Sequence, residues 1–417
     1  MAKKLLLLLL TSMVVVLGLE WAVRRYLPIW GQIYGPDKEL LFDAIPGSSR
    51  IQVMPRENVG EGDAARVLVR IGAEGFRGGD LESPKLRKRL LVIGDSFVMA
   101  ENVPEDRTFV RALGRELGSR LVDPDAEGAD AARQIETVNA GRSSYGPDQA
   151  LLLLRRNLER VRPDLVVCVL CAHNDFGDLM RNKLFYLGED GRAEPAQPVL
   201  GARMVDAFAE RRARSDRPAL QRLWQFWQKN RQGSVASDTV VPSTLSLYAR
   251  ALESQAREHL VARDPEVVSL FKDVYDIDVA ASIPDSFAPA KVELMVGVLA
   301  RMTKLTSKAG VPVVFVVVPS AVDVCANFEL KVDPARFPGH RKTALVDSMV
   351  GAVGLAGGVA IDVTPALTGE GPADRYFVGG QDIHWNAAGQ AVSASYVAEE
   401  LLRDHASARA LGAEEAR

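Results

Sequence analysis

The sequence predicts an α/β fold in which helices cover both faces of a central parallel sheet. Apolar runs of strand length alternate with helical stretches along the chain, and this alternation is typical of parallel sheets. The runs lack a regular apolar–polar alternation, which indicates strands that are buried on both faces. The predicted strands are residues 90–94, 135–139, 164–171, 312–318 and 358–363. The predicted helices lie near residues 104–119, 148–160, 290–309, 341–354 and 386–403.

Two further segments precede and interrupt this α/β domain. Residues 28–88 are rich in glycine, proline and charged residues and predict an irregular or β-containing preface. Residues 177–289 are mostly polar and helical and are too long for a loop, so we expect a mainly helical insertion. The α/β domain is then expected over residues 89–176 and 290–405, with a tail at 406–417.

The first residues have the pattern of a membrane-directed segment. Lys3 and Lys4 precede an apolar run from Leu5 to Leu19, which is typical of a signal-type sequence. No small-residue cleavage motif follows the run, and no early cysteine is present for a lipoprotein anchor. We therefore expect residues 1–27 to form an uncleaved transmembrane signal anchor, with the rest of the chain on the exported, extracytoplasmic side. A cleaved signal peptide is the alternative.

One stretch of the predicted insertion is both basic and aromatic. Residues 211–231 contain seven basic residues against one acidic residue, Asp216. Pro218 suits a helix start, and apolar side chains follow at helical spacing: Leu220, Leu223, Trp224 and Trp227. We favour a cap helix that packs this stripe onto its own domain. The alternative is a surface that contacts a membrane or an anionic glycan.

Composition excludes several classes of protein. The formal net charge is −3, whereas nucleic-acid binders usually carry a large basic excess, so we expect no nucleic-acid partner. The three cysteines are too few for a disulfide framework, and Cys168 and Cys171 are expected in the core. No metal-ligand spacing and no phosphate-binding glycine loop occurs. We therefore expect neither a metal nor a cofactor.

Residues that could take part in catalysis follow four of the predicted strands. Ligands of parallel α/β sheets bind at the carboxyl ends of the strands, where these residues would gather. In chain order they are Ser96 in "GDSF", Gly141 in "NAGRSSYG", Asn174 in "CAHND", and Asp382 with His384 in "QDIHWNAAG". His173, next to Asn174, is expected to shape the pocket without a catalytic role.

These residue types are those of serine acyl transfer. A serine hydroxyl becomes a good nucleophile when a histidine takes its proton and a carboxylate orients that histidine. Ser96, His384 and Asp382 would supply these three roles. The backbone N–H groups of Ser96 and Gly141 and the side-chain amide of Asn174 could form the oxyanion hole. We expect Asp382 and His384 to meet in a loop, because a straight strand would not let them bond side by side.

The four motifs together resemble those of the SGNH/GDSL hydrolase superfamily. "GDSF" is similar to its nucleophile block, Gly141 to its glycine block, "HND" to its asparagine block and "DIHWNAAG" to its Asp/His block. "AEGFRG" at 73–78 resembles the lead-in of membrane-anchored, exported members. The resemblance covers about residues 72–180 and 290–403, and it implies a flavodoxin-like three-layer sandwich, the SGNH hydrolase fold.

One departure from the common superfamily pattern points to a particular branch. The commonest form has aspartate three residues before the histidine, but that position holds Gln381. The carboxylate is instead Asp382, and Trp385 follows the histidine, which resembles the D-x-H-W motif of the alginate O-acetyltransferase-like branch. This resemblance implies modification of a polysaccharide.

The resemblance implies a serine esterase or O-acyl(acetyl)transferase that acts on an acylated carbohydrate or lipid at the cell envelope. It assigns no substrate-binding residues and leaves open an acyl-donating membrane partner. A catalytically inactive glycan-binding protein on the same scaffold is one alternative, which the intact Ser96, Asp382 and His384 disfavour. A lysophospholipase-like lipid esterase is another, which the anchor and the basic helix favour.

Overall fold

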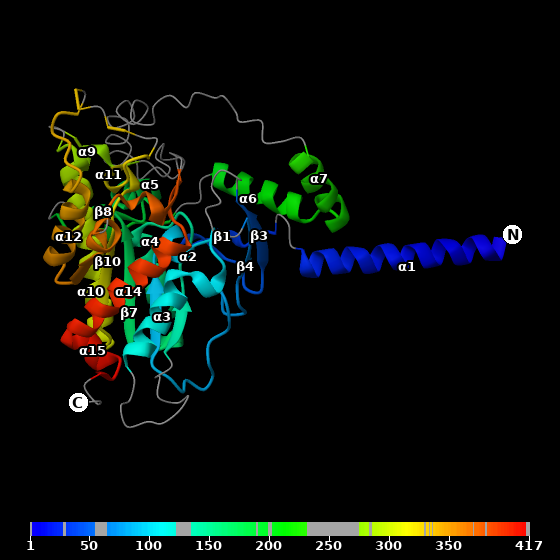
Figure 1. Ribbon diagram of the computed structural model, residues 1–417, viewed down its shortest axis with the longest axis horizontal. Helices are drawn as coiled ribbons and strands as arrows, with labels where there is room; N and C mark the ends of the chain where they lie inside the picture. The colour runs from blue at the N-terminus through cyan, green and yellow to red at the C-terminus, as the bar shows by residue number, and fades with distance from the viewer. Residues whose placement is uncertain are drawn as a thin grey trace.

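A five-stranded parallel sheet forms the centre of the computed structural model of this chain (Figure 1). The strands are β5 (Arg89–Ile93), β6 (Glu136–Asn139), β7 (Leu165–Cys171), β10 (Val313–Val318) and β11 (Val359–Asp362). The structure describes residues 2–27, 31–54, 65–121, 135–188, 191–198, 202–231, 275–282, 286–328, 331–332, 334–335, 337–369, 371–379 and 382–413.

The strand order β11-β10-β7-β5-β6 places the first strand of the sheet between the second and the third. The chain therefore leaves β5 toward one edge and later returns to build the other side. All four neighbouring pairs run parallel. A reversal of this kind opens a crevice at the carboxyl ends of the strands around it. The predicted α/β fold is confirmed, and residue 96 follows the strand at which the order reverses.

Two groups of helices cover the sheet (Figure 1). In one, α3 (Phe109–Arg120) packs against α14 (Ala387–Arg403). In the other, α10 (Ala288–Lys308) packs against α4 (Pro147–Val161) and α12 (Ala344–Leu355). The start of α3 is set locally, because Oγ of its N-cap residue Thr108 accepts the N–H of Arg111. Its apolar residues recur every three or four positions and are buried against the sheet.

The remaining elements of the α/β domain are short. They are α2 (Ser96–Met99), α5 (Asp175–Asn182), α9 (Ile277–Ala280), α11 (Ala321–Val324), α13 (Thr364–Thr368), β12 (Phe377–Gly379), β13 (Asp382–Trp385) and α15 (His405–Ala410), with 3₁₀ turns at Glu105–Arg107 and Ala373–Tyr376. The last helix lies in the segment expected as a tail, where Asp404 Oδ2 accepts the N–H of Ser407 and caps it.

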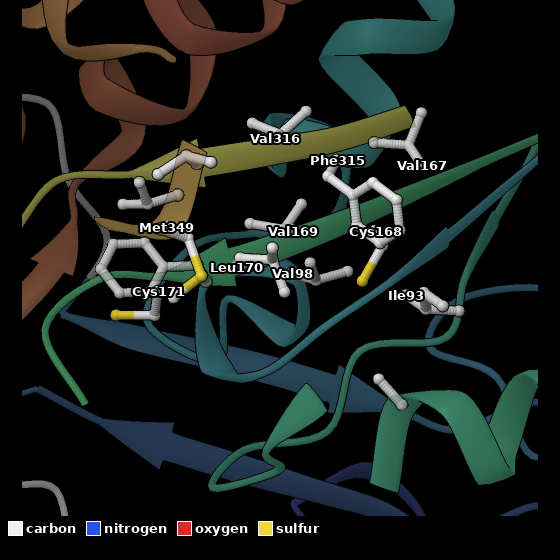
Figure 2. Close-up of a cluster of buried hydrophobic side chains, with 14 of the residues drawn as sticks. Ile93, Val98, Val167, Cys168, Val169, Leu170, Cys171, Phe315, Val316 and Met349 are labelled. Atoms are coloured by element: carbon white, nitrogen blue, oxygen red, sulfur yellow. The ribbon is translucent and has the colours of Figure 1, made fainter. Parts of the chain in front are cut away.

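The core is continuous across β7 and β10 (Figure 2). Every residue of both strands is buried, which explains why neither strand shows an alternating pattern. Cys168 and Cys171 lie in this core without a disulfide, as expected. Burial raises the pKa of both thiols well above the usual range, so they remain protonated core side chains.

Two antiparallel hairpins form the described part of the predicted preface. They pair β1 (Tyr34–Asp37) with β2 (Leu41–Ala44) and β3 (Ser49–Val53) with β4 (Arg66–Arg70). In β4 the valines are buried and the arginines exposed, as a strand with one solvent face requires. The buried side chains of this layer contact Met99 of α2. The preface therefore supports the segment that begins with Ser96.

Part of the expected insertion is described, and it contains both helices and strands. They are β8 (Phe185–Leu187), β9 (Ala193–Pro195), α6 (Ala202–Ser215) and α7 (Ala219–Arg231). Residues 232–274 lie outside the described residues. The favoured interpretation of 211–231 was wrong for the tryptophans: Trp224 is 55% and Trp227 45% exposed. The reason is that α7 packs against the N-terminal helix instead of turning this face to the domain.

The N-terminal helix α1 (Ala2–Tyr26) projects away from the α/β domain and meets α7 near its carboxyl end (Figure 1). Its most apolar 18-residue window has a mean hydropathy of 2.3, and none of that window is buried. It is long and apolar enough to cross a membrane, a property that anchors share with signal sequences.

Candidate active site

Ser96 lies at the start of the short helix α2, which begins after Gly94 and Asp95 at the end of β5. Gly94 has φ +151°, and a Cβ at this residue would lie 2.8 Å from the carbonyl oxygen of Val169. Glycine is therefore required for the turn that leaves the strand. Asp95 Oδ1 then accepts the N–H of Phe97 at 2.9 Å and caps α2. The apolar run thus breaks on residues that turn the chain and present the serine.

Ser96, His384 and Asp382 form one chain of hydrogen bonds. His384 Nε2 lies 2.7 Å from Ser96 Oγ, and His384 Nδ1 lies 2.6 Å from Asp382 Oδ1. A carboxylate accepts only, so Nδ1 carries the proton and Nε2 accepts the serine hydroxyl. The side chains of His384 and Asp382 are 32% and 24% exposed. They are therefore within reach of a substrate while most of their surface is packed.

The Asp–His contact forms on a strand, so the expectation of a loop was wrong. β13 pairs antiparallel with β12, with a register shift between Phe377 and Gly379. Residues two apart on a strand project to the same face. Asp382 Oδ1 also accepts the backbone N–H of His384 at 3.0 Å, which turns the carboxylate back along the chain onto the imidazole. The helix expected near Asn386 is present, and Asn386 is its N-cap.

The local charges favour an ionised aspartate. Burial by itself raises the pKa of Asp382, but the hydrogen bonds and the charge of His384 outweigh burial and hold this pKa below its usual range. An ionised carboxylate at this place stabilises the imidazolium that forms when His384 takes a proton. Gln381, the position at which the commonest pattern has its aspartate, lies outside the described residues.

Aromatic packing holds β13 against α2. The imidazole ring of His384 lies 5.4 Å from the ring of Phe97, and that of Trp385 5.1 Å from it in a T-shaped contact. Trp385 is fully buried, and its carbonyl accepts Asn102 Nδ2 at 2.8 Å. The tryptophan of the D-x-H-W motif therefore acts as a packing residue, which sets the position of the histidine before it.

Two of the expected oxyanion donors, Gly141 and Asn174, already donate hydrogen bonds to protein acceptors. The Gly141 N–H donates to Asn139 Oδ1 at 3.0 Å, and Asn174 Nδ2 donates to Asp178 Oδ2 at 3.1 Å. Gly141 packs tightly against α2, since a Cβ there would lie 2.7 Å from the carbonyl carbon of Val98. The Asn174 amide has a second N–H for a ligand, whereas an oxyanion at Gly141 would share its N–H with Asn139.

His173 belongs to a hydrogen-bonded group that sequence reasoning missed. Its Nδ1 lies 2.8 Å from Oγ of Ser320, and its ring lies 5.5 Å from that of Tyr275. Burial, with a smaller contribution from the charge of His384, lowers the pKa of His173 to about 3. The ring is therefore neutral at ordinary pH. Ser320 follows the predicted strand at 312–318. Because ligands of parallel α/β sheets bind at the carboxyl ends of the strands, a search for polar residues after that strand would have found it.

A buried ion cluster fixes α5 beside this site. Lys291 Nζ lies 2.8 Å from Asp276 Oδ1 and 2.9 Å from Asp278 Oδ1, and all three side chains are fully buried. Asp276 Oδ2 accepts the N–H of Gly177 in α5. Because one lysine serves both carboxylates, the cluster ties α10 to the segment that follows Asn174.

In the part of the chain that the structure describes, no group of three or more His, Cys, Asp or Glu is placed to hold a metal ion.

Residues 281–416 match the family model of the SGNH hydrolase-like domain of the acetyltransferase AlgX. Over this part of the chain, the match supports the SGNH hydrolase superfamily. The resemblance to its alginate O-acetyltransferase-like branch is confirmed, and the chain is an SGNH-type esterase or acetyltransferase. The matched span includes Asp382 and His384, while Ser96, Gly141 and Asn174 lie before it.

Several solved structures of SGNH-type and related hydrolases are similar to the chain at low sequence identity. The lipase/acylhydrolase from Enterococcus faecalis is 11% identical, with 75% of this chain and 95% of that chain covered and a TM-score of 0.35. The carbohydrate acetylesterase Est24 from Sinorhizobium meliloti is 11% identical, with 76% and 99% covered and a TM-score of 0.33. Likenesses this distant carry no inference about the substrate. No curated protein matches the chain.

Proposed function

We propose that this chain is a serine-dependent ester hydrolase or O-acyltransferase that acts on an acylated carbohydrate or lipid at the cell envelope. The observation that supports it best is the hydrogen-bond chain from Ser96 Oγ through His384 to Asp382. An inactive binding protein would not need a serine hydroxyl hydrogen-bonded to an oriented imidazole. The family match, named for an acetyltransferase, supports acyl transfer in general.

In the first half of the proposed reaction an acyl-enzyme forms. Ser96 Oγ attacks the carbonyl carbon of the ester while its proton passes to His384 Nε2. The carbonyl electrons move to the oxygen and give a tetrahedral oxyanion. When the carbonyl re-forms, the bond to the alcohol oxygen breaks, and His384 returns its proton to that oxygen. The acyl group is then bound to Ser96, and Asp382 has stabilised the intervening imidazolium.

The oxyanion is proposed to accept the backbone N–H of Ser96 and the second N–H of Asn174 Nδ2. The interaction of Asn174 with Asp178 supports this role, because it fixes the amide before a substrate arrives. Donors held in place need no reorganisation during the reaction, which is the source of their catalytic value. Gly141 is proposed to contribute mainly through close packing under α2, with its N–H shared as a weaker donor.

In the second half an acceptor oxygen attacks the acyl carbon and gives its proton to His384 Nε2. The bond between the acyl carbon and Ser96 Oγ then breaks, and His384 returns the proton to Oγ, which restores the free serine. If the acceptor is water, the reaction is hydrolysis; if it is a sugar hydroxyl, the acyl group is transferred.

For location, we propose that α1 anchors the chain and that the catalytic domain lies on the exported side. The apolar, unburied α1 supports anchoring, and the two lysines that precede its apolar run support the orientation.

The first test is labelling of the purified full chain with a fluorophosphonate probe, followed by a panel of acetylated sugars and lipid esters. We expect labelling that is lost in Ser96→Ala, while the fold remains intact because a half-buried hydroxyl contributes little packing. Full labelling or full turnover in this variant would remove Ser96 as the nucleophile. Mass spectrometry of acceptor oligosaccharides then separates transfer from hydrolysis, and exclusive turnover of lipid esters would identify a lipase-like enzyme instead.

A further inference from the structure

Two tryptophans on α7 form an exposed apolar patch outside the catalytic site. Trp224 and Trp227 lie one turn apart, and their rings stack with centroids 5.1 Å apart and planes at 27°. Both side chains are about half exposed. Large exposed aromatic pairs on a soluble surface usually mark a contact with another phase or partner, and indole rings favour the boundary between water and lipid.

The start of α7 is fixed to α1. The two carboxylate oxygens of Glu20 accept the N–H groups of Ala219 and Leu220, at 2.6 and 3.0 Å. These are the first two residues of α7, so a side chain of α1 caps the amino end of this helix. Figure 1 shows α7 beside the end of α1 that faces the domain. Any membrane that α1 crosses therefore passes close to α7.

The position of Glu20 sets the depth of α7 relative to such a membrane. The apolar run of α1 ends at Leu19 and Glu20 is the first charge after it. A run of this length spans about 22 Å as a helix, which is shorter than the ~30 Å hydrocarbon core. Lipid headgroups would therefore meet the chain at or just beyond Glu20. Trp21, which is 63% exposed, lies at the same level.

We propose that α7 lies on the outer surface of the membrane and that Trp224 and Trp227 insert among the lipid headgroups. This inference rests on the proposed anchoring by α1. The segment leading into α7 adds exposed basic residues, Arg211, Arg212 and Arg217, which favour an anionic lipid surface. A lipid bilayer fits better than a polysaccharide as the occupant, because the patch is fixed at the level where the apolar segment of α1 ends.

The same contact would orient the catalytic domain. From α7 the chain runs back through α6, whose Phe208 is buried and lies 6.1 Å from the ring of Phe42 in β2. These aromatic rings pack in the cluster that includes Met99, the last residue of α2. Ser96 is the first residue of that helix. The lipid contact is therefore connected to the helix that carries the proposed nucleophile, first along the chain from α7 to α6 and then through the packed side chain of Phe208.

The test uses the full chain reconstituted in unilamellar vesicles of anionic phospholipid, with and without bromine on the acyl chains near the headgroup. Bromine quenches tryptophan fluorescence by contact. In a chain with Trp21→Phe and Trp30→Phe, the emission comes from α7 and from the fully buried Trp385. We expect brominated lipid to quench the emission of the two α7 tryptophans and to leave that of Trp385 unchanged. Adding Trp224→Phe and Trp227→Phe should abolish the quenching.

Two controls make each outcome decisive. Leu355→Trp, placed in the chain that lacks the α7 tryptophans, adds an exposed indole on α12, far from α1 (Figure 1), and should not be quenched. A chain that keeps Trp21 but has Trp30, Trp224 and Trp227 replaced by phenylalanine reports on the anchor.

Quenching of Trp21 without quenching of the α7 tryptophans would overturn the inference and leave the proposed anchoring by α1 intact. If neither Trp21 nor the α7 tryptophans are quenched, the inference and the proposed anchoring by α1 are both overturned. Probe labelling of Ser96 in the same samples tests the catalytic proposal separately. A spectral response of α7 to soluble anionic oligosaccharide, without lipid quenching, would identify a glycan as the occupant and overturn the inference.

Discussion

His384 Nε2 lies 2.7 Å from Ser96 Oγ, although 288 residues separate the two along the chain. The serine leaves the strand at which the sheet order reverses, and the histidine enters from the hairpin that precedes α14. The contact therefore depends on the packing of α2 against β13, which Phe97 and Trp385 provide. The proposed chemistry is built on this contact, and the predictions below test the groups that support it.

Asp382→Asn is expected to lower kcat by about 10⁴-fold, because an amide permits the imidazole tautomer that cannot accept the serine proton. Steady-state hydrolysis of a small acetyl ester measures the effect. The probe-labelling rate should fall in parallel, since both reactions need the same activated serine. Gln381→Ala is the control and should retain nearly full activity. The assignment of the carboxylate would be reversed by an essential Gln381 and a dispensable Asp382.

Asn174→Ala is expected to lower kcat by about 10²–10³-fold with little change in KM, as for the loss of one oxyanion donor. The reason is that an oxyanion exists only in the reaction, so its donor contributes little to substrate binding. Initial rates over a range of ester concentrations separate the two constants. A rise in KM with unchanged kcat would instead make Asn174 a substrate-binding residue.

Gly141→Ala is expected to destabilise the fold by about 1–3 kcal/mol, since the added methyl group would press into α2. The matched control is Gly351→Ala in the exposed middle of α12, where a Cβ meets no atom within 4 Å. That change should stabilise the helix by about 0.5–1 kcal/mol. Equilibrium unfolding in denaturant measures both variants. Equal effects would show that space at Gly141 is not limiting.

The low pKa of His173 predicts a loss of stability in acid. Its pKa is about 3 in the folded protein and about 6.5 when unfolded, so between these values the unfolded chain binds the extra proton. The contribution of His173 is therefore fully present above pH 6.5 and is lost as pH falls toward 3, by at most about 1.4 kcal/mol per pH unit. His173→Asn should remove this slope.

The comparison with the variant is needed because buried carboxyl groups with raised pKa values, Asp148, Asp175, Asp276 and Asp323, act in the opposite direction. The pKa values of Asp148 and Asp323 are raised to about 7, in each case first by burial. Each takes up a proton on folding below pH 7 and so stabilises the folded state as pH falls. The difference between wild type and His173→Asn, followed by thermal unfolding from pH 7 to 4, isolates the histidine. Parallel curves would contradict the predicted slope.

Much of the fold could be predicted from local sequence. All five strands of the sheet lie within about a residue of the predicted runs, because strands buried on both faces require uninterrupted apolar residues. The residues at strand ends could also be found, since polar residues that interrupt such a run carry a desolvation cost unless they reach the cleft or cap a helix. Ser96, Asn174, Asp382 and His384 were identified on this basis and by their resemblance to known motifs.

Only the tertiary structure decided how those residues are held. The strand conformation of Asp382 and His384, the prior engagement of Gly141 by Asn139, and the pairing of His173 with Ser320 depend on partners that other elements bring. The same is true of α7, whose sequence pattern suits a core stripe but whose amino end is capped by Glu20 of a distant helix. Periodicity reports the environment that a side chain prefers. Which atoms meet depends on the path of the chain, because hydrogen-bond partners must come within about 3 Å in a defined direction.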